Sequence, residues 1–133
     1  MPSQLEQIRD QQRETWDKFS SGWKKWDELV LNWLAPVGQD LIRSAALEDD
    51  SNVLDVAAGT GEPGLTAATL VPKGMVTVTD LSDRMLEVAA ENAGRRGRSS
   101  QLSIALQADS RRQGPLLDEP RVAATLRVKV EEV

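Results

Sequence analysis

Residues 53–64 read VLDVAAGTGEPG, an apolar run that contains one carboxylate, Asp55, and then three glycines within six residues. The apolar run, residues 53–57, is expected to form a buried strand that ends at the glycines. A glycine-rich turn between a strand and a helix lets the backbone approach a ligand closely and points free N–H groups at it. The stretch therefore predicts a ligand-binding loop at the carboxyl end of a strand.

The flanking sequence alternates between helical and strand patterns. Helices are expected at 37–45, 62–70 and 83–93, and further strands at 75–79 and 102–106. This order predicts an α/β fold with a Rossmann-like parallel sheet, in which ligands bind at the carboxyl ends of the strands. Each predicted strand ends in or near an acid: Asp55, Asp80 and Asp109.

The first 34 residues contain every aromatic side chain of the protein. Their spacing of 3, 4, 3 and 7 places them on one helical stripe: Trp16, Phe19, Trp23, Trp26 and Trp33. Such a stripe indicates core packing, with an aromatic lid over a ligand pocket as the alternative. Gly22 is expected to split this segment into two helices, and Pro36 to begin a new one.

Composition excludes several kinds of chemistry. The 133 residues include no cysteine and no histidine, so thiolate chemistry, disulfides and histidine bases are absent. A net charge of −5 disfavours binding to nucleic acid, and the short basic cluster at 95–98 is expected to be a solvated helix end. No apolar run is long enough to span a membrane, and the polar first residues do not resemble a secretory signal, so a cytoplasmic protein is expected.

Two cofactors fit the glycine loop. Gly59, Gly61 and Gly64 satisfy G-x-G-x-x-G, and Asp80 follows Gly59 by 21 residues, which suits a nicotinamide dinucleotide. Asp55, however, would repel a pyrophosphate in the same loop, whereas it would attract the sulfonium and ammonium groups of S-adenosylmethionine. The acid thus favours S-adenosylmethionine, and an NAD(P)-binding protein stays the alternative.

The segments VLDVAAGTGEPG and VTVTDLSDRMLEVA resemble class I S-adenosylmethionine-dependent methyltransferases, in particular the ubiquinone and menaquinone biosynthesis C-methyltransferases. The preceding WDKFSSGWKKWDELVLNWLAPVGQDLI is similar to the helical lid of that group, so the resemblance covers about residues 14–110. It implies a methyltransferase that acts on a small-molecule acceptor.

The resemblance also implies roles for individual residues. The cofactor loop, which serves the methionine moiety, would comprise Asp55, Ala57, Gly59, Thr60 and Gly61. Asp80 would accept both ribose hydroxyls, Leu81 would border that ring, Met85 would pack near the adenine, and Ala108 and Asp109 would flank its amine. Trp23 would close over the cofactor or the substrate. No residue can be nominated as a catalytic base or a metal ligand.

The sequence departs from the family after Asp109. Residues 111–133 contain no F-D-x-V strand, and their apolar residues fit a helix better than a strand in our interpretation. We therefore expect a lid segment at 1–47, a cofactor-binding core at 48–110 and a tail of unclear role at 111–133. The fold is expected to be an incomplete seven-stranded sheet, truncated after its third strand, whose open edge is covered by the tail or by a homo-oligomer. A non-catalytic fragment that acts by binding a partner is the remaining alternative.

Overall fold

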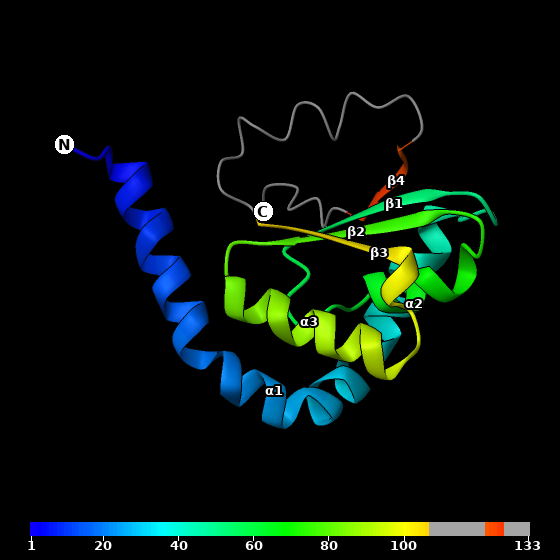
Figure 1. Ribbon diagram of the computed structural model, residues 1–133, viewed down its shortest axis with the longest axis horizontal. Helices are drawn as coiled ribbons and strands as arrows, with labels where there is room; N and C mark the ends of the chain where they lie inside the picture. The colour runs from blue at the N-terminus through cyan, green and yellow to red at the C-terminus, as the bar shows by residue number, and fades with distance from the viewer. Residues whose placement is uncertain (107–121, 127–133) are drawn as a thin grey trace.

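The computed structural model describes residues 1–106 and 122–126 of the chain (Figure 1). The elements follow in the order α1 (Gln4–Ala45), β1 (Asn52–Val56), α2 (Gly64–Leu70), β2 (Met75–Asp80), α3 (Asp83–Arg95), the short 3-10 helix η1 (Ser99–Gln101), β3 (Leu102–Leu106) and β4 (Val122–Leu126). The predicted Rossmann-like α/β fold is confirmed, with a parallel sheet that is incomplete and an N-terminal helix before it.

The sheet has four strands in the order β3-β2-β1-β4. All three neighbouring pairs are parallel, and Asp55 of β1 stands opposite Val78 of β2. Because every described strand points the same way, the carboxyl ends of β1 and β2 lie side by side. This brings the glycine loop after β1 next to Asp80 at the end of β2.

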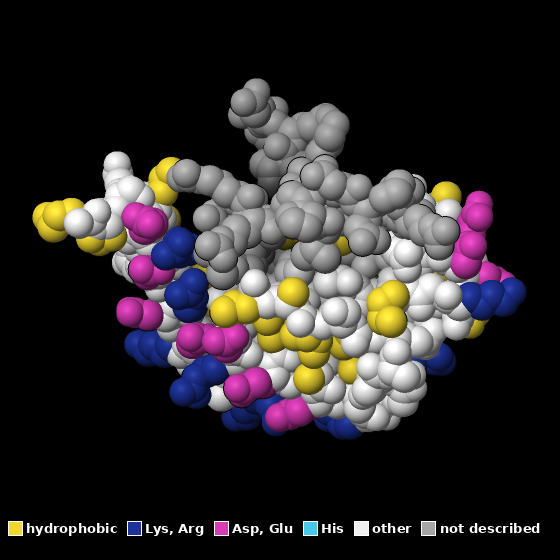
Figure 2. All heavy atoms as spheres, turned by 45° about the horizontal axis from the view of Figure 1, so that its top comes forward, with side chains coloured by type: hydrophobic (Ala, Val, Ile, Leu, Met, Phe, Trp, Pro, Cys, Tyr) yellow, Lys and Arg dark blue, Asp and Glu magenta, His cyan; other side chains and the backbone are white. Residues whose placement is uncertain are grey.

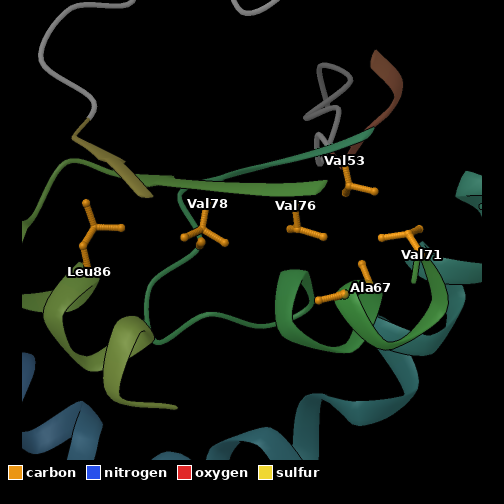
Figure 3. Close-up of a cluster of buried hydrophobic side chains, with 8 residues drawn as sticks. Val53, Ala67, Val71, Val76, Val78 and Leu86 are labelled. Carbon is orange, nitrogen blue, oxygen red and sulfur yellow. The ribbon is translucent and has the colours of Figure 1, made fainter. Parts of the chain in front are cut away.

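Helices α2 and α3 lie against one face of the sheet (Figures 1 and 3). Between them and the strands, a cluster of buried side chains includes Val53, Val76 and Val78 from the sheet and Ala67 and Leu86 from the helices. β-branched residues suit the pleated strand surface, and the small Ala67 lets α2 approach the sheet closely. This layer supports the loops that carry the site.

Helix α1 is continuous, contrary to the predicted break at Gly22 and the predicted new helix at Pro36. It begins at a capping box between Ser3 and Glu6 and ends with Ala46 in the left-handed conformation, at a φ of 47°. A glycine inside a helix costs only about 1 kcal/mol, so it does not stop one that has other contacts. The helix bends around the outside of α3 and continues past α2 (Figure 1).

The C-terminal part of the chain corrects a second expectation. Residues 122–126 form a strand, whereas we expected a helix, and this strand pairs with β1. The sheet therefore does not stop at three strands, and the tail strand extends the edge beside β1, not the β3 edge. Periodicity could not separate the two states, because the apolar spacing of this segment satisfies both.

None of the helices in the described part of the chain is both long and apolar enough to cross a membrane.

Candidate cofactor site

A pocket of about 800 Å³ lies between α1 and the loops that follow β1 and β2. One wall is the glycine loop with Asp80 and Leu81, and the other is the inner side of α1, from Leu5 to Leu34. A pocket of this size at the carboxyl ends of parallel strands is typical of a small-molecule or cofactor site.

The glycine loop takes the left-handed backbone region three times, at Ala57 (φ 59°), Gly59 (φ 57°) and Gly61 (φ 115°). Glycine adopts such angles without strain, whereas Ala57 does so at a steric cost. A Cβ atom at Gly61 would lie only 2.7 Å from Leu65 Cδ1, so this position has no room for a side chain. The loop conformation thus depends on the two glycines and stores strain at Ala57.

Asp80 is held by backbone groups from both sides. Its Oδ2 accepts a hydrogen bond from the Gly59 N–H at 2.9 Å, and its Oδ1 accepts one from the Ser82 N–H at 2.9 Å. Ser82 in turn caps α3, since its hydroxyl accepts from the Met85 N–H at 3.1 Å. The carboxylate lines the pocket in a fixed orientation. Each of its oxygens retains a lone pair, which suits the two adjacent hydroxyls of a ribose.

Asp55 lies behind the loop and does not line the pocket among the described residues. Its side chain is 3% exposed, and its Oδ2 accepts a hydrogen bond from the Gly64 N–H at 2.8 Å. Burial raises the pKa of Asp55 to about 7; the carboxylates of Glu62 and Asp80 act in the same direction, and the Gly64 hydrogen bond opposes them. In the structure Asp55 joins β1 to the start of α2, a role that we did not predict.

Three side chains of α1 that sequence reasoning missed hold this helix over the pocket. Asp27 Oδ1 accepts from the Thr60 hydroxyl at 2.6 Å, and the Asp17 carboxylate accepts from the Ser82 hydroxyl. Arg13 Nε donates to the Leu81 carbonyl at 3.3 Å. The helix is thus attached to both strand-end loops by polar contacts.

The aromatic stripe of α1 is not part of the core. Trp16, Phe19, Trp26 and Trp33 are exposed, so the core-packing interpretation is wrong for these four rings. Trp23 lines the pocket together with Trp16, and their ring centroids are 6.1 Å apart. The alternative that we considered, an aromatic lid, agrees with this placement of Trp23.

The structure brings together most of the residues predicted for the site. Those that line the pocket are Trp23, Ala57, Gly59, Thr60, Asp80, Leu81 and Met85. Asp55 and Gly61 shape the loop from behind, and Ala108 and Asp109 lie outside the described residues.

The charges of the pocket suit a cation better than an anion. Among the described lining residues, carboxylates (Glu6, Asp27, Glu62, Asp80) outnumber guanidinium groups (Arg9). Figure 2 shows acidic and basic side chains interspersed on one face of the molecule, without a single basic surface. These acceptor groups therefore fit S-adenosylmethionine, whose ribose diol donates hydrogen bonds and whose methionine end is positively charged, and they would repel a pyrophosphate.

Fold and site together define the class of this protein as a class I S-adenosylmethionine-dependent methyltransferase domain. A family model described as "Methyltransferase domain" matches residues 53–126, more than half of the chain, and the protein belongs to this family.

The chain is similar to the release factor glutamine methyltransferase of Cereibacter sphaeroides, with 39% identity over 71 residues that cover 53% of this chain and 26% of that protein. The chain thus spans about a quarter of the length of this curated relative. It also resembles the solved structure of coclaurine N-methyltransferase bound to N-methylheliamine and SAH, at 25% identity and a TM-score of 0.51, over 56% of this chain and 21% of that one. The DhpI-SAM-HEP complex shares the fold at 22% identity and a TM-score of 0.54, over 80% of this chain and 45% of that one.

Proposed function

We propose that the pocket between α1 and the glycine loop binds S-adenosylmethionine. We propose further that the protein transfers the methyl group of this cofactor to a small molecule. The observation that carries the proposal is the orientation of Asp80. Backbone N–H groups of Gly59 and Ser82 hold both its oxygens at the pocket wall, where a ribose diol would meet them. A charged acceptor held this way forms strong hydrogen bonds without first losing side-chain entropy.

Within this proposal, the individual residues bind and orient. Asp80 would take the ribose hydroxyls, Leu81 and Met85 would contact the nucleoside, and the backbone at Gly59 and Thr60 would approach the methionine moiety. Ala108 and Asp109 would flank the adenine amine. Trp23 would cover the pocket from α1 and exclude water. The lid at 1–47 and the core at 48–110 would be the functional units, with residues 122–126 added to the sheet of the core.

When bound, the cofactor supplies an electrophilic methyl group on a sulfonium. The chain contains no histidine and no cysteine. Its main contribution to the reaction would be proximity and orientation, worth about 7–11 kcal/mol in favourable cases. This favours an acceptor whose nucleophilic atom needs no histidine base. An acceptor of this kind agrees with the resemblance to the ubiquinone and menaquinone biosynthesis C-methyltransferases, and we propose that the protein belongs to this subgroup. We also propose a cytoplasmic location.

We further propose that a partner surface covers the exposed part of the sheet. On β3, Ile104 is 42% exposed and Leu106 is 41% exposed, although parallel sheets are usually covered on both faces. A second copy of the chain would bury them. Light scattering coupled to size exclusion should then give a dimer mass, and a stable monomer at high concentration would contradict this part of the proposal.

Titration calorimetry of the chain with S-adenosylhomocysteine and with NAD tests the cofactor assignment. We expect saturable heat with S-adenosylhomocysteine and none with NAD. Heat with NAD alone would show that the alternative nicotinamide interpretation holds. No heat with either ligand would favour a non-catalytic fragment that acts by binding a partner.

A further inference from the structure

Asp27 is an acid of α1 that contacts the glycine loop directly and lies at the wall of the pocket. It is half-buried and lines the pocket with Thr60 and Gly59. Its Oδ1 accepts from the Thr60 hydroxyl at 2.6 Å, and its Oδ2 accepts from Asn92 Nδ2 at 3.1 Å. The same Asn92 nitrogen donates to the Thr60 carbonyl at 2.9 Å. The carboxylate is therefore fixed by neighbours from the loop and from α3.

The described side chains that orient Asp27, Thr60 and Asn92, are uncharged. No Lys or Arg of the described residues forms an ion pair with it, whereas Glu62, another carboxylate of the same pocket, pairs with Arg96. Glu6 is engaged by the N-terminal cap of α1. An ionised carboxylate has about four acceptor sites, of which the contacts of Asp27 use two. Asp27, which lines the pocket, therefore has acceptor sites beyond those that Thr60 and Asn92 use.

The position of Asp27 along α1 places it at the end of the pocket where the glycine loop lies. Asp17, ten residues earlier, lies at the Ser82 end of the site, near the ribose acid Asp80. At a rise of 1.5 Å per residue, Asp27 is about 15 Å farther along the helix, at the glycine loop. A ligand with its ribose at Asp80 and its methionine moiety at the loop would therefore extend toward Asp27. Asp55, the loop acid first expected to meet that moiety, is buried behind the loop and does not line the pocket.

We propose that Asp27 is the carboxylate that binds the ammonium group of the methionine moiety, so that helix α1 contributes a cofactor-binding residue as well as a cover. The inference rests on the proposed function. It implies that the bound cofactor connects α1 to the glycine loop through one carboxylate, which Thr60 and Asn92 hold in place.

Two probes that differ at the methionine end test the inference. S-adenosylhomocysteine carries the ammonium group, whereas 5′-methylthioadenosine has the same nucleoside without it. In Asp27→Asn, we expect the dissociation constant of S-adenosylhomocysteine to rise about tenfold or more, because a charge-assisted contact is lost, and that of 5′-methylthioadenosine to change less than about twofold. Asp27→Ser, a second neutral variant, should show the same selectivity if Asp27→Asn does not fold.

Asp17→Asn is the matched control, since Asp17 is also an acid of α1 that accepts a hydrogen bond from a loop, but it does not line the pocket. It should affect both probes to the same degree. An equal loss of both probes in Asp27→Asn, or no loss of either, would overturn the inference while leaving the cofactor assignment intact. A wild-type chain that binds neither probe would instead refute the proposed function, and the inference with it.

Discussion

The backbone N–H of Gly59 donates to Asp80 Oδ2 at 2.9 Å, which joins the loop after β1 to the end of β2 across 21 residues of sequence. The same carboxylate accepts from Ser82 on its other oxygen. Loop and acid therefore form one unit, in which the shape of the glycine loop determines where the carboxylate points.

Replacing Asp80 should weaken cofactor binding more than replacing Asp109. We expect Asp80→Ala to raise the dissociation constant of S-adenosylhomocysteine by about tenfold or more, because hydrogen bonds to a charged group contribute about 1.5–3 kcal/mol each. Asp109→Ala should have a smaller effect, since the resemblance gives Asp109 only a contact near the adenine amine. Calorimetry on both folded variants checks this, and equal losses would contradict the assignment of Asp80 as the ribose acid.

The buried carboxyl of Asp55 should make stability depend on pH. Its pKa is raised to about 7 in the folded chain, so the folded state binds more protons than the unfolded state between about pH 4 and pH 7. Stability from this group is therefore present at low pH and is lost as the pH rises through 7. Asp55→Asn keeps an acceptor for the Gly64 N–H and removes this titration.

Urea denaturation of the wild type and of Asp55→Asn at pH 5, 6, 7 and 8 measures the difference. The free energy of unfolding of Asp55→Asn, relative to the wild type, should rise across this range by an amount on the order of a few kcal/mol and level off above pH 7. A difference that stays constant with pH would show that Asp55 does not titrate in this window.

Replacing either of two alanines in the left-handed backbone region by glycine should increase the stability of the fold. Ala57 in the loop has a φ of 59°, and Ala46 at the end of α1 has a φ of 47°. Ala57→Gly and Ala46→Gly should each raise the free energy of unfolding by roughly 0.5–1 kcal/mol, because glycine adopts these angles without the steric cost. Thermal and chemical denaturation measure both effects. Because Ala46 lies at the end of α1 and does not line the pocket, a loss of stability in Ala46→Gly would show that the left-handed conformation of alanine carries no steric cost there.

Replacing Gly22 or Gly64 by alanine should change the free energy of unfolding in opposite directions. A Cβ at Gly22, within α1, meets nothing within 4 Å, so Gly22→Ala should stabilise the chain by up to about 1 kcal/mol. A Cβ at Gly64 would lie 2.8 Å from Asp55 Oδ2 and 3.0 Å from Val78 Cγ1, so Gly64→Ala should destabilise it by roughly 1–3 kcal/mol. Similar effects of the two substitutions would contradict the close approach of α2 to β1.

Local patterns explain which parts of the fold could be predicted. The β-branched runs of β1 and β2, the glycine loop and the start of α3 at residue 83 depend on neighbouring residues, and these elements were placed correctly. The single helix α1 was not predicted, because its contacts with distant loops compensate for Gly22. The strand β4 was missed because the partner that selects it, β1, lies far away in the sequence.

In the site, too, residues that belong to a local sequence pattern could be predicted, and residues whose partners are distant in the sequence could not. Asp80 could be proposed from the sequence because its distance from the glycines is characteristic of a ribose-binding acid. Asp27 and Asp17, in contrast, meet their partners only in the folded chain, 33 and 65 residues away. The exposed rings of α1 were assigned to the core because periodicity shows that residues share a face, but not which neighbour that face meets.

A crystal structure of the chain with S-adenosylhomocysteine would show whether Asp80 binds the ribose of the cofactor. We predict both ribose hydroxyl oxygens within about 3 Å of the Asp80 carboxylate, with the homocysteine moiety at the glycine loop beneath α1. A ligand bound elsewhere, or one that lies in this pocket with its ribose away from Asp80, would refute the proposed cofactor site.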